Sequence, residues 1–122
     1  MLKDKNKKKQ MDFTEKLKLL GKCLEEKKAE DILLLDVQKF SSVFEGVIIA
    51  TANNVRHAQS LADNLLQFIA EYNFEYFGME GYKAGEWILL DLNDIVIHIF
   101  LQDVRMFYNL EGFWTEAKQI QL

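Results

Sequence analysis

Residues 87–100 constrain the fold more than any other stretch, because they have the pattern of two β-strands joined by a tight turn. Two runs of β-branched, aromatic and aliphatic residues flank a short polar segment, which is typical of a β-hairpin. We predict a two-residue loop at Leu92 and Asn93. That register pairs three sets of residues: Asp91 with Asp94, Leu89 with Val96, and Trp87 with His98.

The two faces of this predicted hairpin differ in chemistry, because neighbouring side chains along a strand point to opposite faces. One face carries the acids, the indole and the imidazole beside apolar side chains. The other face is wholly apolar and should be core; its members are Ile88, Leu90, Ile95, Ile97 and Ile99. What contacts the mixed face is therefore the question on which function depends.

Size and composition indicate one ordinary globular domain. The chain has 122 residues, of which 49% are hydrophobic and 28% charged, enough for a single core. No apolar run approaches the ~18 residues of a membrane span, and no secretory signal is visible. The lone Cys23 excludes an internal disulfide and fits a reducing cytoplasm, where we expect the protein. One Cys with two His cannot supply a usual zinc site, so no metal is expected.

Charge is distributed unevenly along the sequence. Residues 1–10 hold five Lys and one Asp, so the other 112 residues carry a net charge of −8. We interpret 1–10 as a disordered Lys-rich tail and 11–122 as the folded domain. An acidic body disfavours nucleic-acid binding and suits a basic protein partner. Solubility alone explains the same charge equally well.

Hydrophobic periodicity predicts a mixed α/β fold. An apolar stripe from Phe13 to Leu24 predicts a helix over about 12–28, with Asp12 as N-cap. A longer stripe after Asn53 and Asn54 predicts a second helix ending near Tyr72. Strands are expected at 32–37, 47–51 and 74–77, with the last two flanking the second helix in a parallel, right-handed βαβ unit.

With the hairpin, these elements give an α/β domain with a mixed sheet of about five strands and two main helices. A turn or short C-terminal helix should follow from Asp103. Leu110, Phe113 and Trp114 are expected to dock this last segment on the core.

The paired acids raise the possibility of an enzyme. Asp91 with Asp94, or Asp31 with Asp36, would hold Mg²⁺ for nucleotidyl transfer if the carboxylates converged. That chemistry usually has a Gly-rich or Lys-bearing phosphate cradle, and the sequence has none. Asp beside a hairpin loop is also expected from turn chemistry alone. His98 is either a packed imidazole or a general base.

Several segments, taken in order, resemble the ribosomal silencing factor family, also called Iojap or YbeB-like. The resemblance covers about residues 28–114. The matching segments are Ala29-Glu30-Asp31-Ile32, Leu35-Asp36-Val37, Ile48-Ile49-Ala50-Thr51, Arg56-His57, Ala62-Asp63, Gly78-Met79-Glu80-Gly81, Trp87 to Asp91, Asp94 to Phe100, and Arg105, Tyr108, Leu110, Glu111 and Trp114. Each segment is weakly informative by itself, but their order and spacing are specific. The chain departs from the family pattern at Phe44-Glu45, Ala52 and the loop pair Leu92-Asn93, which affects loop detail.

The resemblance implies a compact domain similar in outline to nucleotidyltransferases, without their catalytic apparatus. It implies a non-enzymatic protein without cofactor that binds the large ribosomal subunit through large-subunit protein fourteen. Such a protein blocks joining of the small subunit and represses translation when nutrients are scarce. Homodimers are also a feature of the family. Little direct contact with nucleic acid and none with membrane are expected.

Together, the hairpin chemistry and the resemblance predict a partner-binding face with an apolar centre and acidic edges. Its predicted members are Glu80, Trp87, Leu89, Asp91, Asn93, Asp94, Val96, His98, Arg105 and Tyr108. Two other hypotheses stay open at this point. One is the Mg²⁺-dependent nucleotidyltransferase-like enzyme, and the other is a simple dimerisation module.

Overall fold

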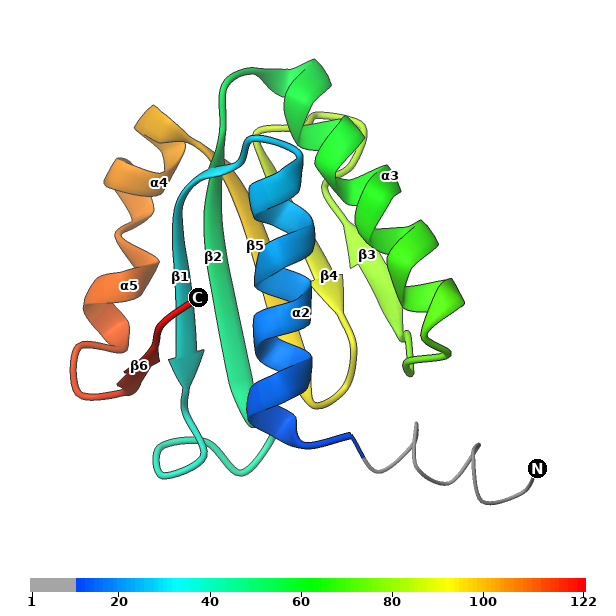
Figure 1. The fold of residues 1–122 in the computed structure, drawn as a ribbon. Helices are drawn as coiled ribbons and strands as arrows, with labels where there is room; N and C mark the ends of the chain where they lie inside the picture. The colour runs from blue at the N-terminus through cyan, green and yellow to red at the C-terminus, as the bar shows by residue number, and fades with distance from the viewer. Residues whose placement is uncertain (1–10) are drawn as a thin grey trace.

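The protein is one α/β unit built on a six-stranded mixed sheet (Figure 1). The computed structural model describes residues 11–122, so the predicted Lys-rich tail lies outside the described residues. In chain order the elements are α2 (Phe13–Glu26), β1 (Glu30–Asp36), β2 (Gly46–Ala52), α3 (Val55–Glu71), β3 (Gly78–Glu80), β4 (Trp87–Asp91), β5 (Ile95–Leu101), α4 (Gln102–Tyr108), α5 (Leu110–Phe113) and β6 (Lys118–Ile120). The strand order is β3-β4-β5-β2-β1-β6. The predicted α/β class, the mixed sheet and the two main helices are confirmed, with one strand more than expected.

The centre of the sheet is the pair β2 and β5, which run parallel with residues 46–52 aligned to 95–101. Every residue of β2 is buried, as are all residues of β5 except Leu101. Strands buried on both faces read as continuous apolar runs, which is what both segments show in the sequence. The other pairings in the sheet are antiparallel.

Helices α2 and α3 lie together on one face of the sheet, where the larger core forms (Figure 1). Both N-caps are as predicted: the Asp12 carboxylate accepts from the Thr14 N–H at 3.2 Å, and the Asn54 Oδ1 accepts from the His57 N–H at 2.8 Å. His57 also joins the two helices, because its Nε2 lies 2.8 Å from the Lys27 carbonyl while its Nδ1 accepts from the Asn53 N–H. Cys23 is buried, and this burial raises the pKa of its thiol, which suits a small core residue.

The register predicted for the hairpin is wrong by two residues. Asp91 pairs with Val96, Leu89 with His98 and Trp87 with Phe100. Leu92 is fully buried and continues the ladder through its N–H to the Ile95 carbonyl, so the loop is Asn93-Asp94. Asn93 takes a φ of 74°, a left-handed conformation that Asn tolerates far better than Leu. Because the shift is an even number, the predicted composition of each face survives.

Two further predictions about the strands need correction. The strand after α3 is β3, at 78–80 and not 74–77, because Phe74 ends the helix through its N–H to the Ile69 carbonyl. β3 pairs antiparallel with β4 at the sheet edge, and β4 and β5 separate it from β2, so β3 does not pair with β2. β6 was not expected; it pairs antiparallel with β1 from Leu34 to Asp36.

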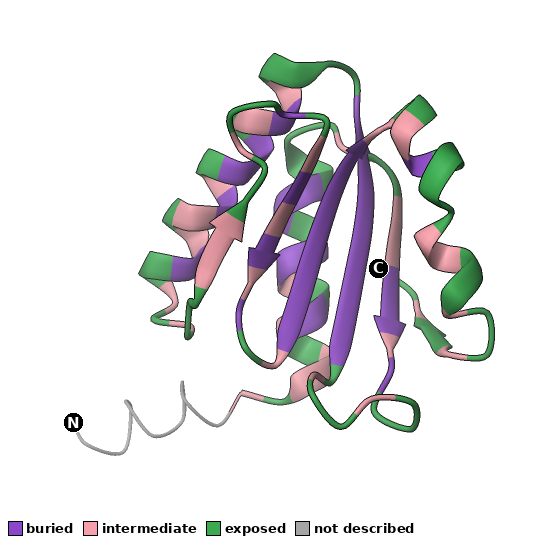
Figure 2. Ribbon diagram, turned by 180° about the vertical axis from the view of Figure 1, so that it is seen from behind, coloured by how far each residue is buried: buried purple, intermediate pink, exposed green. Residues whose placement is uncertain are grey.

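The second face of the sheet is covered only along one side. Seen from behind, β2 and β5 run as continuous buried strands with no helix drawn across them, while α4 and α5 stand beside β1 (Figure 2). A smaller core lies under α4 and α5, where Val104, Leu110 and Trp114 pack against strand residues such as Ile49 and Phe100. The remaining part of this face, over β4 and β5, carries five of the predicted partner-binding residues: Leu89, Asp91, Asn93, Val96 and His98.

The corrected register makes a direct prediction about Asn93. Replacing Asn93 by Ala should lower the free energy of unfolding by about 1 kcal/mol relative to Asn93→Gly, because only Gly takes a positive φ without strain. Both variants lose the hydrogen bond from the Asn93 amide to Glu75, so their difference isolates the backbone. Urea-induced unfolding measures it. Equal stability of the two variants would show that residue 93 does not hold the left-handed position.

Candidate functional site

An open groove of about 470 Å³ lies on the second face of the sheet. Its floor is formed by strand residues and its far wall by the C-terminal segment and the loop between β1 and β2. We call it the sheet groove; its lining residues are Val43, Phe44, Val47, Leu89, Asp91, Asn93, Val96, His98, Leu110, Phe113 and Trp114. A groove with a mainly apolar lining and few polar groups is the usual form of a binding site.

Exposed aromatic and apolar side chains extend from the groove onto α4 and α5. Phe113 is 76% exposed and lines the groove, and Phe107 is 80% exposed. Met106 and Tyr108 are exposed beside them. Isolated exposed apolar residues are common, but several on two adjoining short helices next to an apolar groove form a patch that suits a protein partner.

Trp87 joins this patch to the sheet. Its ring centroid lies 4.8 Å from that of Phe100 on the neighbouring strand and 4.8 Å from that of Tyr108 on α4. Trp87 is half-buried while Tyr108 is exposed, so the pair has one face packed on the protein and one available. Such rigid aromatic anchors carry much of the binding energy in protein interfaces.

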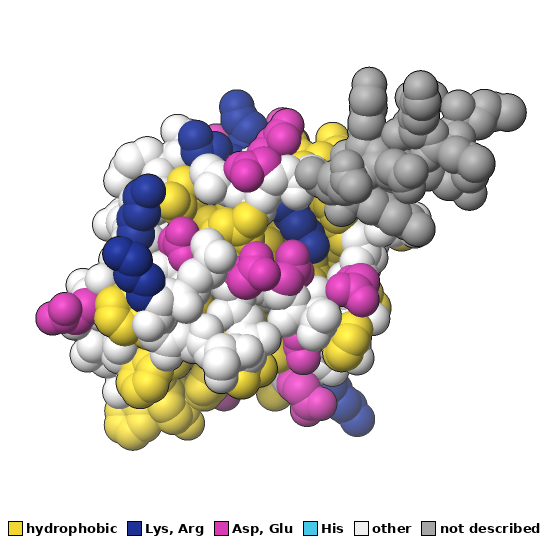
Figure 3. All heavy atoms as spheres, turned by 90° about the horizontal axis from the view of Figure 1, so that it is seen from below, with side chains coloured by type: hydrophobic (Ala, Val, Ile, Leu, Met, Phe, Trp, Pro, Cys, Tyr) yellow, Lys and Arg dark blue, Asp and Glu magenta, His cyan; other side chains and the backbone are white. Residues whose placement is uncertain are grey.

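Acidic side chains border the apolar surface. Viewed from below, at the end where the hairpin loop and the start of α2 lie, hydrophobic side chains gather along one side and acidic ones occupy the middle (Figure 3). Asp91 lines the groove itself, and its carboxylate accepts from the Asn93 N–H at 2.8 Å. Glu80 stands on the edge strand β3 opposite Leu89, on the same face as His98. Apolar centre and acidic border therefore occur together on this face.

His98 lies on the groove floor and is held by Trp87. The Trp87 Nε1–H donates to His98 Nδ1 at 3.0 Å. His98 is only 8% exposed, and this burial lowers the pKa of the imidazole to about 4, because a charged ring is poorly solvated there. The ring is therefore neutral at physiological pH. This agrees with the packed alternative for His98, and the ring remains part of the groove surface.

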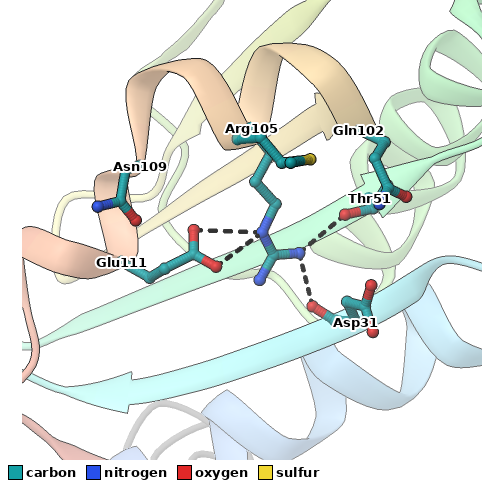
Figure 4. Close-up of a pocket in the computed structure, with 7 residues that line it drawn as sticks. Asp31, Thr51, Gln102, Arg105, Asn109 and Glu111 are labelled. Atoms are coloured by element: carbon teal, nitrogen blue, oxygen red, sulfur yellow. Dashed lines mark hydrogen bonds and ion pairs between the residues drawn. The ribbon is translucent and has the colours of Figure 1, made fainter.

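Arg105 fastens α4 and α5 to the sheet (Figure 4). Its Nε donates to the Glu111 carboxylate on α5 at 3.2 Å. Its Nη1 donates to the Thr51 hydroxyl at 2.8 Å and to the Asp31 carbonyl at 2.7 Å. Arg105 is buried, so it joins four elements from the inside, and it positions the exposed aromatic patch without belonging to it.

The paired acids do not converge on a metal site. The Asp94 carboxylate accepts from Lys16 Nζ of α2 at 2.9 and 3.0 Å, and the same ammonium lies 4.6 Å above the Phe74 ring. Asp91 lies on the groove and bonds its own loop. Within residues 11–122, no group of three or more His, Cys, Asp or Glu side chains could hold a metal ion. In the same range, no helix is long and apolar enough to cross a membrane.

The structure brings together some of the predicted partner-binding residues and separates others. Leu89, Asp91, Asn93, Val96 and His98 line the groove, Trp87 and Tyr108 pack together at its side, and Glu80 shares the same sheet face. Asp94 is tied to α2, and Arg105 points inward.

Sequence reasoning missed part of the groove wall. Leu110 and Trp114 dock on the smaller core as predicted, but Phe113 does not: its side chain is largely exposed. Val43 and Phe44, in the loop after β1, were also missed. A four-residue helix gives too short a period to tell its inner face from its outer one, so the sequence carried no usable signal for Phe113.

Comparison with known proteins identifies the family to which the chain belongs. The family model "Ribosomal silencing factor during starvation" matches residues 10–122. The chain belongs to the ribosomal silencing factor family. It is 36% identical over 108 residues to the ribosomal silencing factor RsfS of Chromobacterium violaceum, covering 88% of both chains. It is 36% identical over 101 residues to RsfS of Bacillus subtilis, covering 83% of this chain and 86% of that one.

The fold agrees with this assignment. A crystal structure of a Chromobacterium violaceum protein superposes with a TM-score of 0.83 at 36% identity, covering 86% of this chain and 88% of that one. The family resemblance inferred from the ordered segments is thereby confirmed.

The hydrogen bonds of Arg105 to Glu111, Thr51 and Asp31 predict what its replacement would do. Arg105→Met keeps most of the side-chain bulk but leaves the Thr51 hydroxyl and the Asp31 carbonyl without their donor. We expect a loss of about 2–4 kcal/mol in unfolding free energy, and faster amide hydrogen exchange in 102–113. Thr51→Val, which removes one of these bonds, should cost about 1 kcal/mol. Unchanged exchange in 102–113 would show that Arg105 does not hold α4 and α5 on the sheet.

The buried imidazole predicts a pH dependence of stability. In the unfolded chain His98 titrates near its ordinary pKa of 6.5, whereas in the folded protein it titrates at about 4. Between these values the unfolded chain binds a proton that the folded ring does not, so stability is lost as pH falls, by up to ~1.4 kcal/mol per pH unit. The difference in unfolding free energy between the protein and His98→Asn should shrink from pH 6.5 to 4. A difference that stays constant over this pH range would show that folding does not lower the pKa of His98.

Proposed function

We propose that this protein binds the large ribosomal subunit through large-subunit protein fourteen and sterically blocks joining of the small subunit. The observation that carries the proposal is the sheet groove with its exposed aromatic patch, on the one sheet face that helices leave partly open, in a member of the ribosomal silencing factor family. Repression of translation under nutrient limitation would follow from the block. The proposal includes a cytoplasmic location and a non-enzymatic mode of action.

The chemistry of this face supports a basic protein as the partner. Trp87, Tyr108 and Phe113 offer aromatic anchors at an apolar centre. Asp91 and Glu80 border that centre with negative charge, and residues outside the Lys-rich stretch carry a net charge of −8. A phosphate-rich surface would be repelled by this arrangement, whereas a basic protein surface is complementary to it.

A steric mechanism requires only that the bound domain occupy space. The carboxylates that an enzyme mechanism would need are engaged otherwise, since Asp94 pairs with Lys16 and Asp91 bonds its own loop. The groove lies open at the surface, so a partner can seat on it without rearrangement of the core. A second copy of the chain is the competing occupant, and it would make this face a dimer interface.

The direct test is subunit association on sucrose gradients. Purified protein added to large subunits before small subunits should reduce the fraction sedimenting as joined ribosomes, in proportion to the large subunits occupied. The protein should co-sediment with large subunits and not with small ones. Full joining in the presence of saturating protein would overturn the proposal. Mass measurement over a range of concentration separates a dimer from a monomer that binds the ribosome.

The aromatic anchors give the sharpest variants. Trp87→Ala should weaken binding to large subunits by about 2–4 kcal/mol, or roughly 30- to 1000-fold, because it removes a central anchor. Trp87 also packs on Phe100, so Tyr108→Ala, at an exposed position, is the companion that leaves the core intact. Leu122→Ala is the matched control: Leu122 is 47% exposed and lines a pocket with α2 residues such as Leu19, on the other sheet face. Equal affinity of all three would place the contact elsewhere.

A further inference from the structure

The hydrogen bond between Trp87 and His98 fixes which ring nitrogen of His98 carries the proton. An indole Nε1–H can only donate, so His98 Nδ1, 3.0 Å away, must accept. A neutral imidazole has one acceptor nitrogen and one N–H. The proton of His98 is therefore on Nε2, and this nitrogen is a hydrogen-bond donor.

This donor has no partner within the described part of the chain. The hydrogen bonds of His98 there comprise only the one from Trp87, and no buried side-chain nitrogen or oxygen among residues 11–122 lacks a partner. Nε2 must therefore be reached by solvent, although His98 as a whole is 8% exposed. The surface that solvent reaches is the floor of the sheet groove, which His98 lines. The His98 Nε2–H thus faces the groove among apolar neighbours such as Leu89 and Val96.

We propose that the His98 Nε2–H is a specificity group of the sheet groove, donating a hydrogen bond to an uncharged carbonyl oxygen of the protein that docks there. The inference rests on the proposed function and deepens it by naming an atom that the partner must present. A main-chain or amide oxygen fits better than a carboxylate, because Asp91 lines the same groove and Glu80 stands in the same row of the sheet. A carboxylate would meet this negative charge.

The surroundings of His98 make the bond selective. In the free protein, water reaches Nε2 and satisfies it. Docking removes water from the groove, and a partner without an oxygen at this point leaves a dehydrated N–H unpaired, which weakens binding. Trp87 has two roles under this proposal, since its ring is an anchor and its Nε1–H sets the tautomer of His98. The neutral ring also makes the interaction insensitive to pH near neutrality.

Two substitutions distinguish the role of Nδ1 from the role of Nε2 in His98. In His98→Asn the amide oxygen can occupy the place of Nδ1 and still accept from Trp87, but nothing replaces the Nε2–H. In His98→Gln the amide group reaches the place of Nε2 and can donate there. We expect His98→Asn to bind large subunits about 10- to 100-fold more weakly than the unchanged protein, and His98→Gln to retain more affinity than His98→Asn. Thermal unfolding of both variants checks that the fold is kept.

Three outcomes decide the matter. If the unchanged protein fails to bind large subunits, the proposed function falls and this inference falls with it. If it binds and His98→Asn binds equally well, only the inference is overturned. The ratio of the two affinities should stay constant as salt is raised, and a ratio that falls steeply would indicate a carboxylate acceptor and overturn the choice of an uncharged oxygen.

The tautomer can be measured without any partner. Nitrogen-15 NMR of the His98 ring in the free protein should show a protonated Nε2 and a bare Nδ1 at neutral pH. Trp87→Phe removes the indole donor and should allow the proton to distribute over both nitrogens. A protonated Nδ1 in the unchanged protein would contradict the geometry from which the inference begins.

Discussion

The parallel pairing of β2 with β5 at the centre of the sheet determines which surfaces the other elements have to cover. Both strands are apolar on both sides, so each face of the sheet has to be shielded from water. On one face α2 and α3 do this with two long apolar stripes. On the other face, the short α4 and α5 are the only helices of the described residues, and they lie to one side, over the smaller core (Figure 2). The groove over β4 and β5 is the part of that face which residues 11–122 leave uncovered.

The proposed function depends on side chains that fix the exposed aromatic patch relative to the groove. Arg105 is buried and ties α5, β2 and the start of β1 to α4, so the exposed aromatic patch has a fixed position relative to the groove. Trp87 then connects the aromatic patch with the groove floor, because its ring packs against Tyr108 and its Nε1–H donates to His98. The surface is therefore preorganised, so this protein loses little conformational entropy when a partner binds. Such a surface suits recognition of another protein by occupation of space.

Much of this was predictable from the sequence, and the exceptions have physical causes. The two long helices, their caps at Asp12 and Asn54, and the mixed sheet follow from periodicity and capping chemistry. The faces of the hairpin were predicted correctly although its loop was misplaced, because a shift of two residues preserves every side-chain direction. The edge strand β6 and the exposure of Phe113 were missed, since three- and four-residue elements carry no periodicity. Contacts between segments far apart in the sequence, such as Arg105 with Thr51 and Lys16 with Asp94, cannot be predicted from local sequence patterns.

Site-specific photo-crosslinking can show whether the sheet groove contacts large-subunit protein fourteen. A photoreactive amino acid placed at Phe113, on the groove wall, is compared with the same amino acid at Leu122, on the opposite sheet face. After irradiation with intact large subunits, the crosslinked ribosomal component is identified by mass spectrometry. We expect a crosslink from position 113 to large-subunit protein fourteen and none from position 122. A crosslink to that protein from position 122 alone, or from position 113 only to a second copy of this chain, would contradict it.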